Sequence, residues 1–266
     1  MLGDAKAAVV PGVRCVSMDL NADLGESYGR WTLGDDEALI AHITSANVAC
    51  GFHAGDFNVM EASVERCARA GVAVGAQPGY PDLLGFGRRP MPFTPTEAES
   101  LVRYQLGALD AFCRAHGVEL RHVKPHGALY NQAAADPALA DAIARAVARF
   151  SRDLLLFGRA TSEPMRSAAA EHGLRFVAEA FADRRYLPDG TLQPRSEPGS
   201  VITDPSEAAA QAVQIAVSGS LVAVSGEAVA LAAESICCHG DTPGAAAIVA
   251  AVRAALESAD VAVAAP

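Results

Sequence analysis

Short apolar segments alternate with helical patterns along most of this chain. Apolar runs predict strands at residues 13–20, 43–48, 72–76, 120–124, 154–157, 174–179, 221–224 and 235–238. Amphipathic periodicity predicts helices at residues 35–42, 58–70, 96–116, 137–150, 163–172, 205–217 and 243–258. A strand followed by a helix is the rhythm of a parallel sheet, and about seven such repeats favour a closed barrel.

Helix-start signals in the sequence support this division into strands and helices. The segments 94–97 and 204–207 each place a proline after Thr94 or Asp204 and an acid soon afterwards, which is typical of helix starts. We predict one α/β domain over residues 1–266, with loose tails at 1–12 and 259–266. The irregular segment 181–201 is long enough to cover the mouth of a barrel.

The first predicted strand carries polar residues where an apolar core is expected. Because side chains alternate along a strand, Asp19, Asn21 and Asp23 share one side. Uncompensated carboxylates inside a fold are costly, so we expect cations, a metal or a substrate beside them. The alternative is that Asp23 and Glu26 only form a turn or cap a helix.

Further polar clusters follow other predicted strands, at residues 49–56, 77–82, 124–131 and 239–244. The carboxyl ends of parallel barrel strands open on one face, so these clusters should converge into one pocket. His53, His126 and His239 are each followed by Gly or Ala, which leaves room for a ligand beside the ring. Histidine can transfer a proton near neutral pH or bind a metal.

Lysine usage singles out one residue. The chain has 21 Lys and Arg residues, and Lys124 and Lys6 are the lysines among them. A sequence that otherwise uses arginine indicates a specific need for the compact ammonium of Lys124, as an oxyanion-binding cation or as a desolvated base. An ordinary ion pair with Asp19 or Asp23 is the competing interpretation.

Composition and absent motifs narrow the function. A net charge of -10 over 266 residues disfavours nucleic acid and anionic membranes as partners. The sequence shows neither a long apolar span nor a signal-peptide pattern, so we expect a cytoplasmic protein. It contains no phosphate-binding loop, dinucleotide fingerprint, nucleophile elbow or H-E-x-x-H motif.

Five motifs resemble the LamB/YcsF family: DLNADLGE at 19–26, TSANVACGFHAGD at 44–56, GFGRR at 85–89, VKPHGALYN at 123–131 and HGDTPG at 239–244. The resemblance extends over about residues 16–258. It departs at Gln77, where the family more usually has histidine, and a role that needs a proton or a metal there is therefore in doubt.

The resemblance implies a distorted (β/α)7 barrel similar to glycoside hydrolase and deacetylase barrels. It also implies the A subunit of a bacterial ATP-dependent 5-oxoprolinase, which opens 5-oxo-L-proline to L-glutamate while ATP becomes ADP and phosphate. ATP is then a co-substrate, with Mg²⁺ held mainly by partner subunits B and C, and no organic cofactor is expected. The A subunit would complete water attack and ring opening on a phosphorylated lactam.

On that basis we assign residues to roles. A base among Asp19, Asp23 and His53 activates water, while Lys124 with His126 or His239 stabilises negative oxygen and a second histidine protonates the ring nitrogen. Arg88 or Tyr80 holds the substrate carboxylate. The expected substrate-binding residues are Asn21, Asn47, Gln77, Tyr80, Arg88, Tyr130 and Asp241.

Two other functions stay open at this point. The first is a metal-dependent deacetylase or amidohydrolase, in which Asp19, Asp23, His53 and His126 surround a divalent ion that activates water. The second is a noncatalytic ligand-binding subunit, although such pockets are usually mostly apolar. Acids and histidines in sequence do not by themselves choose between these functions.

Overall fold

The computed structural model describes residues 17–266, so the predicted tail 1–12 and the start of the first predicted strand lie outside the described residues. Its barrel strands are β1 (Ser17–Leu24), β2 (Ser45–Ala49), β3 (Ala73–Gln77), β4 (Leu120–Val123), β5 (Leu155–Arg159), β6 (Phe176–Phe181) and β9 (Ser235–Cys238). The helices are α1 (Asp36–Ile40), α2 (Phe57–Ala70), α3 (Pro95–Ala115), α4 (Gly127–Ala133), α5 (Pro137–Phe150), α6 (Glu163–Glu171), α7 (Pro205–Ser218) and α8 (Ala245–Ser258).

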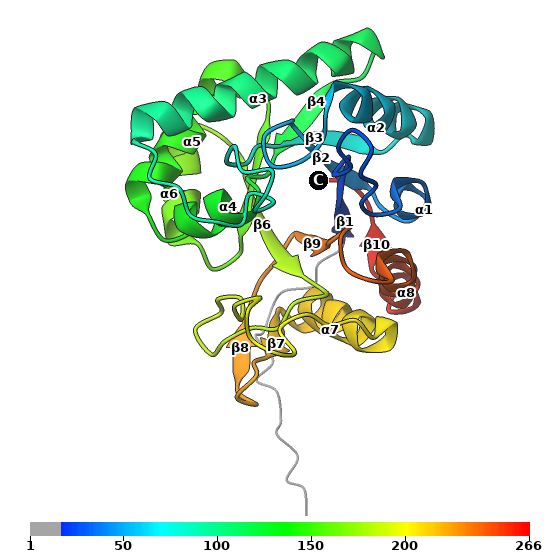
Figure 1. The fold of residues 1–266 in the computed structure, drawn as a ribbon. Coiled ribbons are helices and arrows are strands. Elements are labelled where there is room, and N and C mark those ends of the chain that lie inside the picture. The colour runs from blue at the N-terminus through cyan, green and yellow to red at the C-terminus, as the bar shows by residue number, and fades with distance from the viewer. Residues whose placement is uncertain (1–16) are drawn as a thin grey trace, which may run out of the picture.

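The strands form a closed parallel barrel. Their order is β1-β2-β3-β4-β5-β6-β9, and pairing of β9 with β1 closes the ring of seven strands. Helices surround the ring when it is viewed along its axis (Figure 1). A register shift between Val74 and Gly75, where β3 meets β4, distorts the barrel. The predicted (β/α)7 architecture is confirmed.

The two faces of strand β1 have different surroundings. The side chains on one face are fully buried in the apolar core: Met18, Leu20, Ala22 and Leu24. Asn21, between them in sequence, instead hydrogen-bonds to side chains of other strands across the interior. The polar side of β1 therefore faces into the barrel, as strand alternation predicts.

Helix starts follow the signals in the sequence. The Thr94 hydroxyl accepts a hydrogen bond from the backbone N–H of Glu97, whose carboxylate in turn accepts one from the N–H of Thr94. Asp204 accepts hydrogen bonds from the first backbone N–H groups of α7. These caps fix where each helix leaves its loop, and hence where the strand-end loops lie.

Three segments differ from the sequence predictions. The strand predicted at 221–224 does not join the barrel: β7 (Ser220–Val222) pairs antiparallel with β8 (Ala228–Ala230), because Gly226, with φ of +86°, turns the chain between them. The segment 259–266 is not loose, because β10 (Ala262–Val263) pairs with the start of β1. Helix α4 lies within the polar cluster at residues 124–131 and just beyond it, where the sequence pattern predicted no helix.

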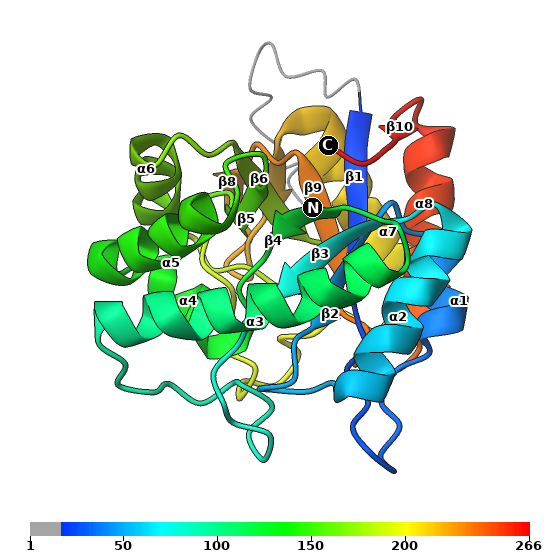
Figure 2. The ribbon, with the colours of Figure 1, turned by 90° about the horizontal axis from the view of Figure 1, so that it is seen from above.

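The loops that follow the strands gather on one face. In Figure 2, β10 and the start of β1 lie at the upper edge, whereas the loops after β1 and β3 extend from the lower edge. Within residues 17–266, no helix combines the length and the apolar character needed to cross a bilayer.

Candidate active site

A cavity of about 420 Å³ opens at the carboxyl ends of the barrel strands. The segment 181–201 covers part of it, through Leu192, Gln193, Pro194 and Arg195. The polar lining residues are Asp23, Gln77, Arg88, Lys124, His126, Tyr130, Asn131, Arg159, Arg184, Gln193, Arg195 and His239. This is the face on which β/α barrels carry their active sites.

Beneath the cavity, a hydrogen-bonded network crosses the barrel interior. The Asn21 Nδ2 group donates to Glu179 Oε1 at 2.9 Å and to Ser235 Oγ at 2.7 Å. The Asn47 Nδ2 group donates to Asn21 Oδ1 at 2.7 Å and to Asp23 Oδ1 at 3.0 Å. The two carboxamides therefore join side chains of β1, β2, β6 and β9 and hold the carboxylates of Glu179 and Asp23 in place.

Lys124 lies at the centre of this network. Its Nζ is 2.8 Å from Glu179 Oε1, 3.3 Å from Asp23 Oδ1 and 3.0 Å from Cys237 Sγ. Burial by itself lowers the pKa of Lys124, but Asp23, Cys237 and Glu179 raise it well above the ordinary value. Lys124 is thus a fixed positive charge at neutral pH and not a base.

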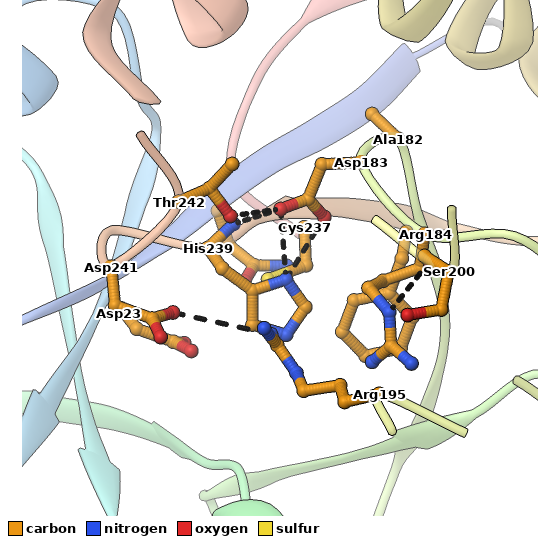
Figure 3. A network of polar contacts seen from close by, with 12 residues as sticks. Asp23, Ala182, Asp183, Arg184, Arg195, Ser200, Cys237, His239, Asp241 and Thr242 are labelled. Carbon is orange, nitrogen blue, oxygen red and sulfur yellow. Dashed lines mark hydrogen bonds and ion pairs between the residues drawn. The ribbon is translucent and has the colours of Figure 1, made fainter. Parts of the chain in front are cut away.

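Asp183 and His239 form a second pair (Figure 3). His239 Nδ1 lies 2.9 and 3.0 Å from the two carboxylate oxygens of Asp183, and the Thr242 hydroxyl donates to Asp183 at 2.9 Å. Burial raises the pKa of Asp183, but His239 and these hydrogen bonds bring it below the ordinary value. Because an ionised carboxylate only accepts, His239 carries its proton on Nδ1 and leaves Nε2 for a ligand.

His53 and His126 stack beside Glu26. The two rings are parallel within 3°, with centroids 3.7 Å apart. His126 Nε2 donates to the Phe86 carbonyl at 2.9 Å, so its Nδ1 has a free lone pair. Burial lowers the pKa of His126 to about 3, and burial together with His126 lowers that of His53 well below its ordinary value. Both rings are therefore neutral at physiological pH.

Glu26 completes this group without a hydrogen bond to its Oε1. That oxygen lies 3.9 Å from His53 Nε2 and 3.8 Å from His126 Nδ1. Burial, Asp23 and Asp241 raise the pKa of Glu26 well above the ordinary value. Gln77 is close enough to influence the pKa of His53, but no hydrogen bond of acceptable geometry joins the two side chains.

Glu26, His53 and His126 are the described residues whose donor atoms suit a metal, since these atoms lie within 4.8 Å of one another. One carboxylate and two imidazoles match the donors that Zn²⁺ prefers. The orientation does not match, because lone pairs in two stacked, parallel rings do not converge on one point. Asp19 and Asp23, which the sequence suggested as metal ligands, are not in this group.

Four arginines contribute positive charge to the cavity wall: Arg88, Arg159, Arg184 and Arg195. Arg88 Nη2 pairs with Asp241 Oδ2 at 2.7 Å, and Arg195 Nη2 lies 3.9 Å from the other oxygen of Asp241. With Lys124, the wall carries five cations although the whole chain has a net charge of -10. Such a cavity favours anionic ligands.

Most residues singled out in the sequence meet at this cavity. Asp23, Gln77, Arg88, Lys124, His126, Tyr130 and His239 line it. Asn21 and Asn47 lie in the network below, Asp241 pairs with Arg88, and His53 stacks on His126. The predicted polar clusters at strand ends therefore converge on one cavity, whereas the roles of the individual residues remain predictions.

Asp19 and Tyr80 lie elsewhere, which corrects two expectations. Asp19 does not line the cavity: it accepts hydrogen bonds from the Thr44 and Ser45 hydroxyls, both at 2.7 Å, and from Ser235. These hydroxyls meet the needs of its carboxylate, so neither a metal nor a substrate is required. Tyr80 is 1% exposed and stacks on Phe93 in the core, so of the two residues predicted to bind the substrate carboxylate only Arg88 lines the cavity.

Sequence reasoning missed several polar groups of the site. Asp183 and Arg184 follow β6, Arg159 ends β5, and Glu179 lies within β6. The rule that strand ends converge applies to these two strands as well as to the others. Applied to every predicted strand, it identifies Arg159, Asp183 and Arg184. The pairing of Glu179 with Lys124 depends on barrel register and has no sequence signal.

Asp183 gives a pH-dependent prediction. Its pKa lies below the value of 3.8 taken for the unfolded chain, so its stabilisation is present above about pH 4 and is lost as pH falls through the folded pKa. Asp183→Asn should lower the free energy of unfolding by about 1–3 kcal/mol at pH 7 and by a smaller amount at pH 3. Urea unfolding at both pH values measures this.

The exposed Asp153 supplies the matched control. Asp153→Asn should leave the unfolding free energy within about 0.5 kcal/mol of the original at both pH values. An Asp183→Asn deficit of equal size at pH 7 and pH 3 would show that the charge of Asp183 is not what stabilises the pair.

Comparisons with known proteins match nearly the whole described chain. The LamB/YcsF family model matches residues 18–266. A 5-oxoprolinase A subunit from Chloroflexus aggregans is 54% identical over 251 residues, covering 94% of this chain and 99% of that protein. Another from Symbiobacterium thermophilum is 53% identical over 249 residues, covering 94% and 95%.

A solved structure is also similar over nearly the whole chain. The crystal structure of a lactam utilization protein from Thermus thermophilus superposes with a TM-score of 0.88 at 48% sequence identity, covering 94% of this chain and 100% of that chain. Sequence and fold thus agree over the same residues. The chain belongs to the LamB/YcsF family.

Proposed function

We propose that this chain is the A subunit of an ATP-dependent 5-oxoprolinase, which opens the lactam of 5-oxo-L-proline to L-glutamate while ATP becomes ADP and phosphate. The names of relatives that are 54% and 53% identical support this activity. The observation that carries it is the anion-attracting cavity in which Lys124 and the Asp183-paired His239 meet.

The chemistry follows from the stability of the lactam amide. Phosphorylation of its carbonyl oxygen by ATP makes the ring carbon electrophilic. Water adds to that carbon, the C–N bond breaks as the ring nitrogen takes a proton, and the acyl phosphate that results is hydrolysed to glutamate and phosphate. Phosphorylation speeds ring opening because it withdraws electrons from the carbon that water attacks, and phosphate is then a good leaving group when the acyl phosphate is hydrolysed.

The residues of the cavity fit this sequence of steps. The fixed charge of Lys124 stabilises the negative oxygens of the phosphorylated lactam. His239 Nε2 takes a proton from the water and delivers one to the ring nitrogen, while Asp183 holds the imidazole in place. The Arg88 guanidinium, partly neutralised by Asp241, holds the substrate carboxylate.

The rest of the enzyme comes from other chains in this proposal. The sequence lacks a phosphate-binding loop, so partner subunits B and C would bind most of the nucleotide and its Mg²⁺. Because the reaction consumes ATP, we expect it to run in the cytoplasm. Neutral His53 and His126 then shape the wall beside Gln77 and do not carry charge.

His239→Asn should reduce glutamate release by about 10²-fold or more in a complete mixture with the partner subunits, because proton transfer is lost. Lys124→Met should reduce it by about 10²–10³-fold through loss of the oxyanion-binding charge. Both rates are measured from 5-oxoproline and ATP, with circular dichroism to establish folding.

His42 lies away from the cavity, so His42→Asn is the control and should keep the original rate. Near-normal rates in both His239→Asn and Lys124→Met would overturn the assigned roles. A loss in His42→Asn as large as that in His239→Asn would indicate a general effect on folding.

A metal-dependent hydrolase is the second candidate, favoured by the unpartnered Oε1 of Glu26 beside His53 and His126. Because the rings are stacked, we expect much less than one equivalent of zinc or other transition metal in protein purified from metal-supplemented cells. Elemental analysis measures this. A full equivalent that disappears in His53→Ala but persists in His42→Asn would favour the metal hydrolase.

A further inference from the structure

One part of the cavity wall carries arginines that nearby carboxylates do not neutralise. Arg159 ends β5 and Arg184 follows β6, and these two strands are paired neighbours in the barrel. Arg195 comes from the covering segment 181–201. All three line the same cavity as Lys124 and His239.

Arg159 is buried without a partner. It is 9% exposed, its Nε has no hydrogen bond, and its guanidinium forms no ion pair within residues 17–266. Glu179 is paired with Arg159 in the strand register, but its Oε1 forms an ion pair with Lys124 Nζ at 2.8 Å. The nearby Asp189 instead accepts hydrogen bonds from Thr191. A buried guanidinium without a partner is costly, so a site for an anion is indicated.

Arg184 is held in place by neutral groups. It is 5% exposed, and it donates to the Ser200 carbonyl at 3.3 Å and to the Gln193 carbonyl at 2.6 Å. Carbonyls satisfy its N–H groups without balancing its charge, and Asp183, the carboxylate that acts on that charge, is already paired with His239. Burial and Arg195 lower the pKa of Arg184 to about 10, so it is still cationic at neutral pH.

Arg195 completes the cluster next to His239 (Figure 3). Its Nη2 has no hydrogen bond and lies 3.9 Å from Asp241, whose other oxygen is held by Arg88 at 2.7 Å. The carboxylates that act on the guanidiniums of Arg159, Arg184 and Arg195 thus all have other partners: Asp189 accepts from Thr191, Asp183 pairs with His239 and Asp241 pairs with Arg88. Like charges gathered in this way are stable only when an anion joins them.

We infer that Arg159, Arg184 and Arg195 form a subsite for a phosphoryl group, separate from Arg88, which faces the substrate carboxylate. A carboxylate has two oxygens and one charge, and one guanidinium fork satisfies it. A phosphoryl group has three terminal oxygens and up to two charges, which suits several forks at once. This inference rests on the proposed function, in which a phosphoryl group enters the cavity.

Two sources can supply that group: the terminal phosphate of a nucleotide, or the phosphorylated lactam. Inorganic phosphate reproduces the shared chemistry and tests the subsite itself. The nonhydrolysable nucleotide β,γ-imido-ATP tests the nucleotide source. Both probes bind, or fail to bind, the chain alone, so the result does not depend on the partner subunits.

Isothermal titration calorimetry of the full chain with phosphate, at constant ionic strength, tests the subsite. We expect saturable binding that Arg159→Gln weakens by about tenfold or more, because charge-assisted hydrogen bonds are lost. Arg152→Gln, at an exposed position just before β5, should change the dissociation constant less than about twofold. Arg195→Gln, on the surface segment, should weaken binding even if Arg159→Gln fails to fold.

Absence of saturable phosphate binding, or equal weakening by Arg152→Gln and Arg159→Gln, would overturn the subsite. If β,γ-imido-ATP binds more tightly than phosphate and needs Arg159, the subsite takes a nucleotide phosphate. If it binds no better than phosphate, the subsite takes the phosphorylated lactam. A mixture that binds phosphate but releases no glutamate would reject the proposed function and leave the subsite standing.

Discussion

The site depends on one buried ammonium group that is shared between two carboxylates. Lys124 lies 2.8 Å from Glu179 and 3.3 Å from Asp23, in a region where either acid alone would be costly to ionise. The carboxamides of Asn21 and Asn47 donate hydrogen bonds that hold the two acids in place. Because these partners come from different strands, the barrel must close before the charge of Lys124 is stabilised.

That arrangement also sets the electrostatics of the cavity above it. The carboxylates nearest the centre are already engaged: Asp23 and Glu179 with Lys124, and Asp183 with His239. The arginines of the wall therefore keep most of their charge for a ligand. Neutral His53 and His126 add polar atoms without adding charge. The charges in the barrel interior are thus paired, whereas the mouth of the cavity is positively charged. This arrangement is suited to binding and activating an anionic substrate.

The fold could largely be predicted from sequence, because hydrophobic periodicity and helix caps are local signals. The alternation in β1, the caps at Thr94 and Asp204, and the convergence of strand ends all follow from such signals. The roles of Asp19 and Glu179 could not be predicted, since they depend on which strands become neighbours. Gly226 is a local signal for a hairpin turn. The apolar run just before it, at residues 221–224, favoured a barrel strand instead, so the hairpin was not predicted.

The central claim is that this chain supplies the ring-opening site of a multisubunit 5-oxoprolinase. Glutamate release from 5-oxoproline and ATP, measured for this chain alone, for partner subunits B and C alone and for all three mixed, tests it most directly. We expect glutamate release only in the complete mixture. Equal release by the partners without this chain, or no release from a folded complete mixture, would contradict it.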